Sequence, residues 1–378
     1  MEYLDFEIVS KNDTGCTVKV PAYRVDVTRE CDVVEDVLRI YGYNNVELPG
    51  SMRVSINPSL HPDPETVRAE ISDLLAHRGF TEIMNNSLTK SAYYEKLKTY
   101  PSEKCVKLLN PLSADLDCMR QTLLLSGLEV VSYNIKRQTT DMKLFEIGNV
   151  YSYSPKEGEE MPGAILKSYK EHQALSILVT GPGTKSWRNE TGAGNYFVLK
   201  GMVELILSRF GCNVYDLECG DAPGDIFEEG LEYKLQGKTL VTLGTVSKKL
   251  SKQFDIKQPV FAAEFSWPVL FEVIRRNKVK YKELPKYPEV RRDLAILVDE
   301  DVPFANLRKA ALQAEKGLLK QITLFDVYRG EKIPAGKKQY AMGFVLQDME
   351  QTLTDQAVDK AMEKILKAFE TRFGATLR

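Results

Sequence analysis

At 378 residues the chain exceeds the usual size of one domain, so two or three packed units are expected. Hydrophobic residues make up 43% and charged residues 28%, a balance that excludes an intrinsically disordered chain. No apolar run approaches the roughly 18 residues needed to cross a bilayer, so no membrane association is expected. The net charge of −2 excludes a uniformly basic protein, and any nucleic-acid surface must therefore be local.

The first segment of the chain alternates in a strand, turn and strand pattern. Residues 5–9 and 16–27 flank a turn at 11–15, which indicates a β-hairpin. From Asp32 the apolar residues recur at helical spacing, and Gly42 follows as the expected helix stop. About 45 residues are too few to stand alone as a domain.

The central segment predicts a larger unit in which strands and helices are mixed. One helix begins at Pro64, and a second ends at Gly211. Strands are expected at 143–151, 174–181 and 260–267, and a hairpin turns at 236–238. The absence of regular βα alternation favours an antiparallel α+β sheet over a doubly wound one.

A basic linker is predicted at 275–292, and a distinct domain follows it. The expected order is βαββαβ, the ferredoxin-like split unit. Its six elements are predicted at 293–298, 304–315, 321–328, 339–347, 355–373 and 375–377. The second helix has the strongest signal, because Thr354 or Asp355 can cap an apolar stripe that runs along one face.

Four carboxylates lie close together in the stretch RVDVTRECDVVEDVLRIYGYNN, residues 24–45. Asp32, Glu35 and Asp36 share one helical face, and Asp26 precedes them on the expected strand. Hard oxygen ligands of this kind suit Mg²⁺ or Ca²⁺. The four side chains are therefore candidates for a metal site.

A structural role explains the same acidic residues. Asp32 is a good helix N-cap, Glu35 sits three residues later as in a capping box, and Arg39 can pair with Glu35. Acidic residues in a first turn are also favoured by the helix dipole. Spacing by itself favours this interpretation and leaves the metal site as the alternative.

Several segments, taken in order, resemble the C-terminal part of bacterial phenylalanyl-tRNA synthetase beta subunits. They include PAYRVDVTRECDVVEDVLRIYGYNNVELP, NPLSADLDCMRQTLL, KLFEIGNVY, LKGMVELI, PKYPEVRRDLAILVDE, LFDVYRGEKIPAGKKQYA and TLTDQAV. The resemblance implies a chain that lacks the family's N-terminal tRNA-binding and editing domains. It also implies three parts: half of a metal-associated domain at 1–48, a catalytic-like class II synthetase module at 49–283, and an anticodon-binding ferredoxin-fold domain at 284–378.

The resemblance assigns roles to the acidic cluster and to a partner chain. It implies that Asp26, Asp32, Glu35 and Asp36 bind Mg²⁺ at a site shared with a catalytic alpha subunit, although Asp36 is usually Glu in the family. It further implies an (αβ)₂ heterotetramer in the cytoplasm that binds tRNA(Phe). The chain has six cysteines, and no two of them are spaced as a CxxC pair. Six cysteines in a chain of this length do not indicate a disulfide framework, which agrees with a reducing cytoplasm.

The catalytic-like module is expected to be catalytically silent, with ATP bound by the alpha subunit. Adenylate formation needs cationic groups at the phosphates, for which Arg is best suited. This chain has Ser152 where catalytic relatives place their motif-two Arg, and no glycine-rich strand followed by Arg supplies motif three. No catalytic residue is therefore assigned.

The last domain is expected to bind RNA through cations and exposed aromatic groups. The candidates are Arg291, Arg292, Tyr328, Arg329, Lys337 and Lys338. The leading hypothesis is thus a non-catalytic scaffold and tRNA-binding part of a phenylalanine–tRNA ligase. A free-standing RNA-binding or regulatory paralogue and an independent class II-like enzyme are the alternatives.

Overall fold

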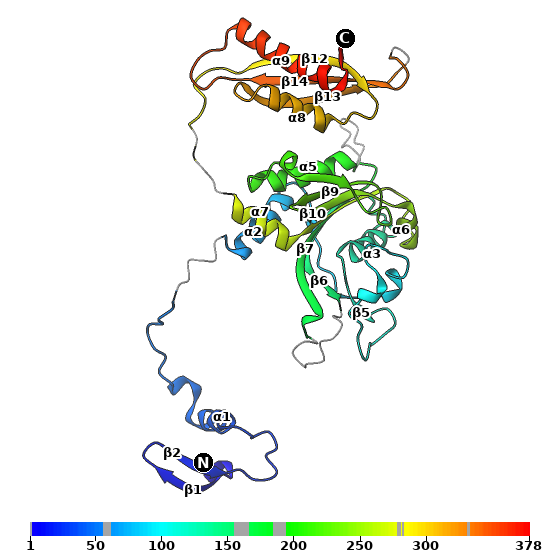
Figure 1. Cartoon of the computed structure of the whole chain (residues 1–378). Helices are drawn as coiled ribbons and strands as arrows, with labels where there is room; N and C mark the ends of the chain where they lie inside the picture. The colour runs from blue at the N-terminus through cyan, green and yellow to red at the C-terminus, as the bar shows by residue number, and fades with distance from the viewer. Residues whose placement is uncertain are drawn as a thin grey trace. The chain divides into compact units, whose positions relative to one another are not determined.

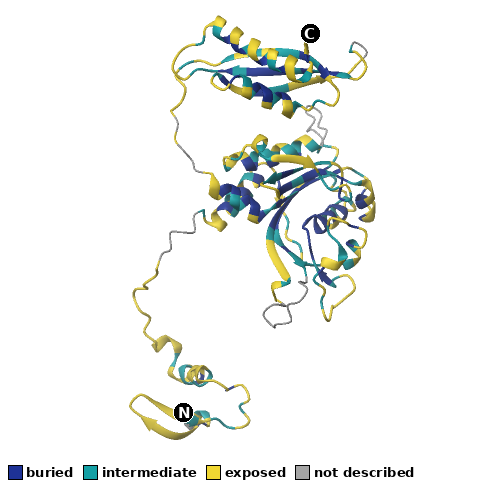
Figure 2. Cartoon of the chain, in the orientation of Figure 1, coloured by how far each residue is buried: buried dark blue, intermediate teal, exposed yellow. Residues whose placement is uncertain are grey.

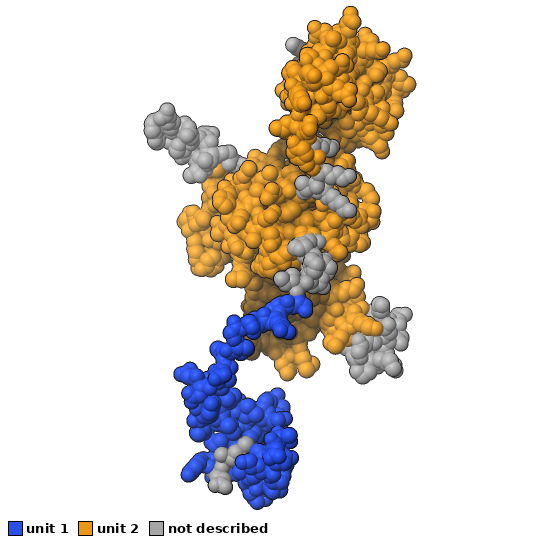
Figure 3. All heavy atoms as spheres, turned by 90° about the vertical axis from the view of Figure 1, so that its left-hand side faces the viewer, with its two compact units in different colours: residues 1–61 blue, residues 62–378 orange. Residues whose placement is uncertain are grey.

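The computed structural model describes residues 2–55, 62–154, 166–183, 194–277, 281, 283–330 and 333–378. Two compact units are distinguished, residues 1–61 and residues 62–378 (Figure 3). Across the described ranges, no helix is both long enough and apolar enough to cross a membrane. The chain is a mixture of α and β elements, as the sequence predicts (Figure 1).

The first unit is a two-stranded hairpin followed by a helix. Its elements are η1 (Glu2–Leu4), β1 (Glu7–Asn12), β2 (Gly15–Lys19), α1 (Glu30–Tyr41) and η2 (Tyr43–Asn45). The second strand was expected to reach residue 27 but ends at Lys19. Pro21 follows, and turns closed by Arg24 N–Pro21 O and Val27 N–Arg24 O hydrogen bonds replace the strand. Most residues of this unit are exposed, as Figure 2 shows.

A seven-stranded sheet forms the centre of the second unit, in the order β3-β6-β7-β11-β10-β9-β8. The strands are β3 (Thr81–Glu82), β6 (Met142–Tyr153), β7 (Tyr169–Thr180), β8 (Glu218–Asp221), β9 (Phe227–Leu235), β10 (Lys238–Val246) and β11 (Val260–Ser266). All neighbouring pairs are antiparallel except the short parallel pair β3–β6. The predicted antiparallel sheet is confirmed, and so is the hairpin at 236–238.

Helices and loops cover both faces of this sheet. One face packs against α2 (Pro64–Ala76), α5 (Tyr196–Arg209) and α7 (Trp267–Arg276), which form a buried apolar cluster with alternate strand residues (Figure 2). The other face packs against α3 (Leu124–Ile135) and α6 (Lys248–Gln253). Helices α3, α6 and α7 were not predicted from the sequence. The strand predicted at 260–267 is β11, and it ends one residue earlier because α7 starts at Trp267.

Short elements complete the loop region on the α3 side of the sheet. They are β4 (Leu88–Thr89), η3 (Ser91–Tyr93), η4 (Ser102–Lys104) and β5 (Cys118–Met119), and the turn η5 (Val214–Asp216) precedes β8. Strands β4 and β5 pair with each other, and this pairing holds the loop that leads to α3. The loop carries the polar network described below.

The C-terminal domain has the predicted βαββαβ order. Its elements are β12 (Val290–Asp299), α8 (Phe304–Ala314), β13 (Leu319–Tyr328), β14 (Lys337–Leu346), α9 (Asp355–Phe373) and β15 (Thr376–Leu377). The sheet order is β13-β14-β12-β15, with both helices packed on one face. Helix α9 has the predicted bounds, because Thr354 Oγ1 caps its start and Gly374 ends it in the left-handed conformation (φ 58°).

Candidate functional site

The acidic segment lies around the start of helix α1 in the first unit. The helix begins at Glu30, so the prediction that Asp32 is its N-cap is wrong and Asp32 is instead its third residue. Asp32 Oδ2 accepts hydrogen bonds from the backbone N–H groups of Thr28 at 3.0 Å and of Arg29 at 2.8 Å. This is the returning half of a capping box, and it stabilises the first helical turn.

Arginine contacts set the charge state of the Asp32 carboxylate. Arg29 Nη2 lies 2.9 Å from Asp32 Oδ1. This guanidinium, together with the two backbone N–H donors, holds the pKa of Asp32 well below its usual range. Asp32 is therefore ionised at neutral pH and already engaged by donors of its own chain.

A second guanidinium joins two other members of the cluster. Arg24 Nη2 lies 3.0 Å from Asp26 Oδ2 and 2.6 Å from Asp36 Oδ2. Asp36 is only 8% exposed, and Arg39 Nη2 lies 3.8 Å from its Oδ1 atom. The suggested pairing of Arg39 with Glu35 is wrong, because the i,i+3 neighbour lies closer to this guanidinium than the i,i+4 neighbour does.

The four carboxylates do not form a preformed cation cage in this chain. Among the residues that the structure describes, no group of three or more His, Cys, Asp or Glu side chains is placed to hold a metal ion. Asp26, Asp32 and Asp36 are bound to arginines, whereas Glu35 is exposed. A divalent cation would have to compete with these guanidinium groups for the same oxygens.

The six RNA-binding candidates of the C-terminal domain do not lie on one surface. Neighbouring strand residues project to opposite faces of a sheet, so Arg291 and Arg292 cannot face the same side, nor can Lys337 and Lys338. On β14 the buried residues at even positions face the two helices, and the odd positions face away from them. The sequence placed these pairs together because they are adjacent along the chain.

Three candidates lie on the face of the sheet away from the helices. Arg291 pairs with Asp293 at 3.2 Å, and Lys337 pairs with Asp299 at 3.6 Å. Tyr328 is 39% exposed and lies opposite Gln339 on β14. We call this face, with Arg291, Tyr328 and Lys337, the open face.

Arg378 joins the open face although the sequence analysis did not select it. Its guanidinium carbon lies 5.9 Å from the centre of the Tyr328 ring, and its Nη1 atom donates to Gln339 Oε1. Its backbone N–H bonds to Ala295 O, which continues the pairing of β15 with β12. The local sequence gives no signal for this position, because the pairing joins chain segments about 80 residues apart.

The other three candidates are placed elsewhere. Arg292 Nη2 pairs with Asp355 at 3.0 Å, at the start of helix α9, and Arg329 Nε pairs with Glu300 at 2.9 Å. Lys338 is only 5% exposed, and its Nζ atom lies 4.9 Å from the centre of the Tyr340 ring. Lys338 therefore points into the domain core, which argues against a surface contact with RNA.

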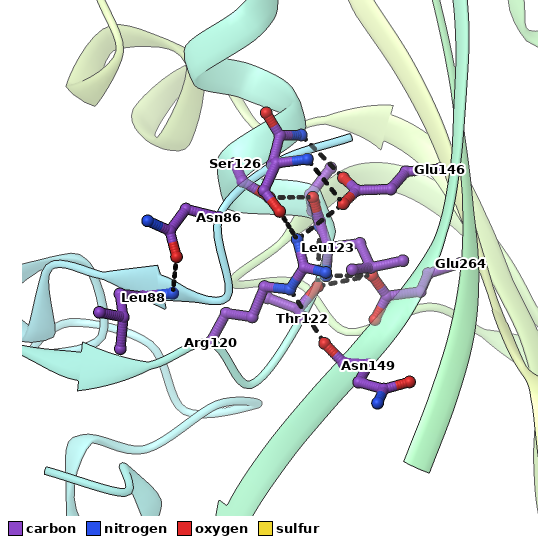
Figure 4. A network of polar contacts seen from close by, with 11 residues as sticks. Asn86, Leu88, Arg120, Thr122, Leu123, Ser126, Glu146, Asn149 and Glu264 are labelled. Atoms are coloured by element: carbon purple, nitrogen blue, oxygen red, sulfur yellow. Dashed lines mark hydrogen bonds and ion pairs between the residues drawn. The ribbon is translucent and has the colours of Figure 1, made fainter. Parts of the chain in front are cut away.

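We call residues 62–277, the part of the second unit built on the seven-stranded sheet, the central unit. It contains a buried ion pair beside this sheet (Figure 4). Arg120 Nη1 lies 2.7 Å from Glu146 Oε1, and both side chains are at most 4% exposed. Arg120 Nε also donates to Asn149 O at 2.9 Å. Because this guanidinium is buried and paired with a buried carboxylate, it is not free to bind a phosphate group.

A second buried carboxylate receives the next residues of the same loop (Figure 4). Glu264 Oε2 accepts hydrogen bonds from Thr122 Oγ1 at 2.7 Å and from Leu123 N at 2.9 Å. Tyr100 OH donates to its Oε1 atom at 3.2 Å. Neither Arg120 nor Glu264 was selected from the sequence, since neither lies in a charged motif. Ser152 lies inside β6, which extends beyond the predicted strand end.

Comparison with known proteins places these features in a family. The model of the phenylalanyl tRNA synthetase beta chain CLM domain matches residues 51–267, that of the ferredoxin-fold anticodon binding domain matches 285–378, and that of the tRNA synthetase B5 domain matches 1–43. One solved structure, a pyrrolysyl tRNA synthetase from Desulfitobacterium hafniense, is 14% identical with a TM-score of 0.42, covering 58% of this chain and 69% of that chain. That likeness is too slight to assign the fold.

Curated relatives cover almost the whole chain. The phenylalanine–tRNA ligase beta subunits of Bacteroides fragilis and Bacteroides thetaiotaomicron are each 45% identical to it over 99% of its length, and that of Carboxydothermus hydrogenoformans is 32% identical over 100%. In each case the match covers 46% of the relative, so the chain spans about half the length of these proteins. The first of these domain models covers more than half of the chain, and it names the same protein as the curated relatives do. The chain therefore belongs to the phenylalanyl-tRNA synthetase beta chain family.

Proposed function

We propose that this chain is a non-catalytic scaffold and tRNA-binding part of a phenylalanine–tRNA ligase. It would support the ATP-dependent attachment of phenylalanine to tRNA(Phe) by an alpha subunit that binds the ATP. The observation that carries this proposal is the identity of 45% to ligase beta subunits along almost the whole chain. The division into parts at 1–48, 49–283 and 284–378 belongs to the same proposal.

The central unit acts as a scaffold in this proposal. Its antiparallel sheet would be a class II synthetase-like module that has lost catalysis. The buried Arg120 supports this interpretation, because its guanidinium is tied to Glu146 and Asn149 and cannot hold a phosphate. An independent class II-like enzyme would instead need free arginines at the reacting phosphates.

The open face of the C-terminal domain is the proposed RNA surface. Lys337, Arg291 and Arg378 can neutralise phosphates, and the half-exposed Tyr328 ring can stack on an unpaired base. The ion pairs of Lys337 and Arg291 are exposed, so an RNA phosphate can displace the carboxylates at small cost. Lys338 is excluded from this surface by its burial.

Binding of tRNA(Phe) by the chain tests this surface through its salt dependence. The Lys337→Ala change should reduce the slope of log K against log salt by about 0.7–0.9, since one phosphate contact is lost. The matched control is Lys360→Ala, an exposed lysine on helix α9, on the helix-covered side of the domain, and it should leave the slope unchanged. Equal slopes for both variants would remove the open face as the RNA surface.

We propose that Asp26, Asp32, Glu35 and Asp36 contribute to a Mg²⁺ site that the alpha subunit completes. The two chains would form an (αβ)₂ assembly in the cytoplasm. Arginine partners occupy Asp26, Asp32 and Asp36, so Glu35 is the carboxylate most accessible to such a site. Glu35→Gln should therefore weaken Mg²⁺-dependent association with the alpha subunit while leaving helix α1 intact. Unchanged association in a Mg²⁺ titration would favour a purely structural acidic cluster.

A free-standing RNA-binding or regulatory paralogue is the second candidate function. It shares the ferredoxin-fold domain and therefore the tRNA-binding test, but it requires no alpha subunit. Co-expression of the full-length beta chain with an alpha subunit separates the two proposals. Co-purification and charging of tRNA by the pair alone support the ligase, whereas a beta chain that stays alone supports the paralogue.

A further inference from the structure

The central unit contains a cavity of about 400 Å³ on the α3 side of its sheet. The cavity is open to solvent and lies entirely among described residues of one unit. Its walls combine apolar side chains with a few polar groups, the usual composition of a small-molecule site. Among its lining residues are Leu124, Val150, Phe227, Thr122, Thr242 and Glu264.

A row of polar residues crosses this face of the sheet. Strand pairing places Glu146 opposite Ser176, Ser176 opposite Glu264, Glu264 opposite Thr242, and Thr242 opposite Glu232. Directly paired residues project to the same face, so five neighbouring strands contribute one polar side chain each. Three of the five, namely Glu264, Thr242 and Glu232, line the cavity.

One member of the polar row, Ser176, has no hydrogen-bond partner among the described residues to explain it. Ser176 is 1% exposed, and its hydroxyl finds no hydrogen-bond partner in the described part of the chain. A buried hydroxyl without a partner costs about 1–3 kcal/mol, so an apolar residue would stabilise the sheet better. The sheet therefore retains one polar group, directly opposite the cavity-lining Glu264, at a cost in stability.

One carboxylate of the row has no cationic partner. Glu146 is paired with Arg120 at 2.7 Å, and Glu232 is paired with Lys234 at 2.9 Å. Among the described residues, Glu264 is bonded only to neutral donors. Burial accordingly raises the pKa of Glu264 above its usual value. A cation in the cavity would supply the missing charge.

Three basic residues line the cavity, namely Lys104, Lys170 and His172, and none of them forms an ion pair with Glu264. Lys104 is exposed on the turn η4, and the other two lie far along strand β7 from this point. His172 and Lys170 are four and six residues from Ser176 on β7, which corresponds to about 13 Å and about 20 Å at the rise of an extended strand. Burial lowers the pKa of His172, which favours its neutral form at pH 7. The end of the cavity at Glu264 is thus acidic and partly apolar.

From this geometry we infer that the cavity is a binding site for a small primary amine with an apolar body. Glu264 receives the ammonium group, and Leu124, Ala174 and Ala262, which line the cavity near this carboxylate, contact the apolar part. The hydroxyls of Thr122 and Thr242 complete the polar end. An α-amino acid fits this end less well, because its carboxylate would lie beside Glu264.

Calorimetric titration of the 378-residue chain with phenethylamine tests the inference. The probe carries one ammonium group and one ring, and 3-phenylpropionate is the matched anionic probe. Glu264→Gln removes the charge, and Ala174→Leu fills the cavity from a residue that lines it. Glu229→Gln, on an exposed side chain of β9 outside the cavity, is the control for the same substitution.

We expect phenethylamine to bind the parent chain at one site. Its affinity should be about tenfold lower for Glu264→Gln and for Ala174→Leu, and it should be unchanged for Glu229→Gln. It also expects 3-phenylpropionate to bind about tenfold more weakly than the amine. Equal binding of both probes, or binding that neither cavity variant weakens, would overturn it, as would no binding of the amine at millimolar concentration. If Glu264→Gln does not fold by circular dichroism, Ala174→Leu decides alone.

Discussion

Replacing Arg120 with alanine should strongly destabilise the central unit. The change removes the cation from a pair whose side chains are 4% and 2% exposed, and so leaves Glu146 buried without a cationic partner. Asn85 still donates to both Glu146 oxygens, through its backbone N–H at 3.1 Å and its Nδ2 at 2.7 Å, but these donors are neutral. Breaking one side of such a pair costs about 3–5 kcal/mol, because the remaining charge loses its partner and cannot reach water.

Urea denaturation followed by tryptophan fluorescence measures this loss. Trp267 is 6% exposed and belongs to the apolar cluster on one face of the seven-stranded sheet, so its fluorescence reports on the folding of that unit. With a denaturant slope of about 3 kcal/mol per molar, a loss of about 3–5 kcal/mol lowers the unfolding midpoint by about 1–1.7 M. A change of this size is easily resolved.

The matched control is Arg209→Ala. Arg209 pairs with Glu70 at 3.4 Å, but its side chain is 58% exposed, so its loss should cost less than about 1 kcal/mol. A double change of Arg120→Met with Glu146→Gln should recover most of the stability, because no uncompensated charge remains. The reasoning is refuted if Arg120→Ala costs no more than the control, or if the double variant is as unstable as the single one.

Two further predictions concern local structure. Arg29 and two backbone N–H donors depress the folded-state pKa of Asp32, so its stabilisation of helix α1 is present above the unfolded pKa of about 3.9 and is lost as the pH falls through the folded value. Asp32→Asn should therefore lower hydrogen-exchange protection of α1 at pH 7, and the difference from the parent should shrink in acid; a difference independent of pH would contradict this. Gly374→Ala should destabilise the C-terminal domain by about 1 kcal/mol, because φ at this residue is 58°. Gly201→Ala in helix α5 should instead stabilise its unit by about 0.5–1 kcal/mol, because the added Cβ would meet no atom within 4 Å. Thermal melts of the two variants should shift in opposite directions, and shifts of the same sign would count against the backbone argument.

Elements with strong local signals were predicted closely from the sequence. Helix α9 has its expected bounds, because the capping Thr354, the apolar stripe and Gly374 all lie within one continuous segment. The hairpin at 236–238 was also predicted, because alternating apolar and polar residues flank a short turn that contains Gly237. In the structure Gln236 and Gly237 adopt the positive φ angles of 50° and 75° that such a tight turn requires. Helix α3 was missed, since its many buried apolar residues weaken the amphipathic pattern. Helix α7 was missed because it begins at Trp267, directly after β11 ends at Ser266, and no turn residues separate the two elements.

The side-chain partners of the acidic cluster could not be predicted from residue spacing. The sequence correctly gathered its residues near one helix start, but the N-cap is Arg29, three residues before the predicted Asp32, and this shift changed the role of Asp32. It could not show that Arg24 reaches both Asp26 and Asp36, because the turns between residues 20 and 28 fold that guanidinium back onto the helix. Side-chain partners across turns depend on backbone geometry that spacing does not specify.

What the sequence by itself determined is the order and type of the strongly patterned elements, together with the family resemblance. Tertiary structure alone decided the face on which a residue lies and the partner that it finds. The alternation of side chains along β14 sends Lys337 and Lys338 to opposite faces. Strand pairing brings Arg378 to Tyr328 and aligns Glu264 with Ser176, 88 positions earlier in the chain. The physical reason is that strand pairing joins distant segments, and a shift of one residue in register would send every side chain to the opposite face.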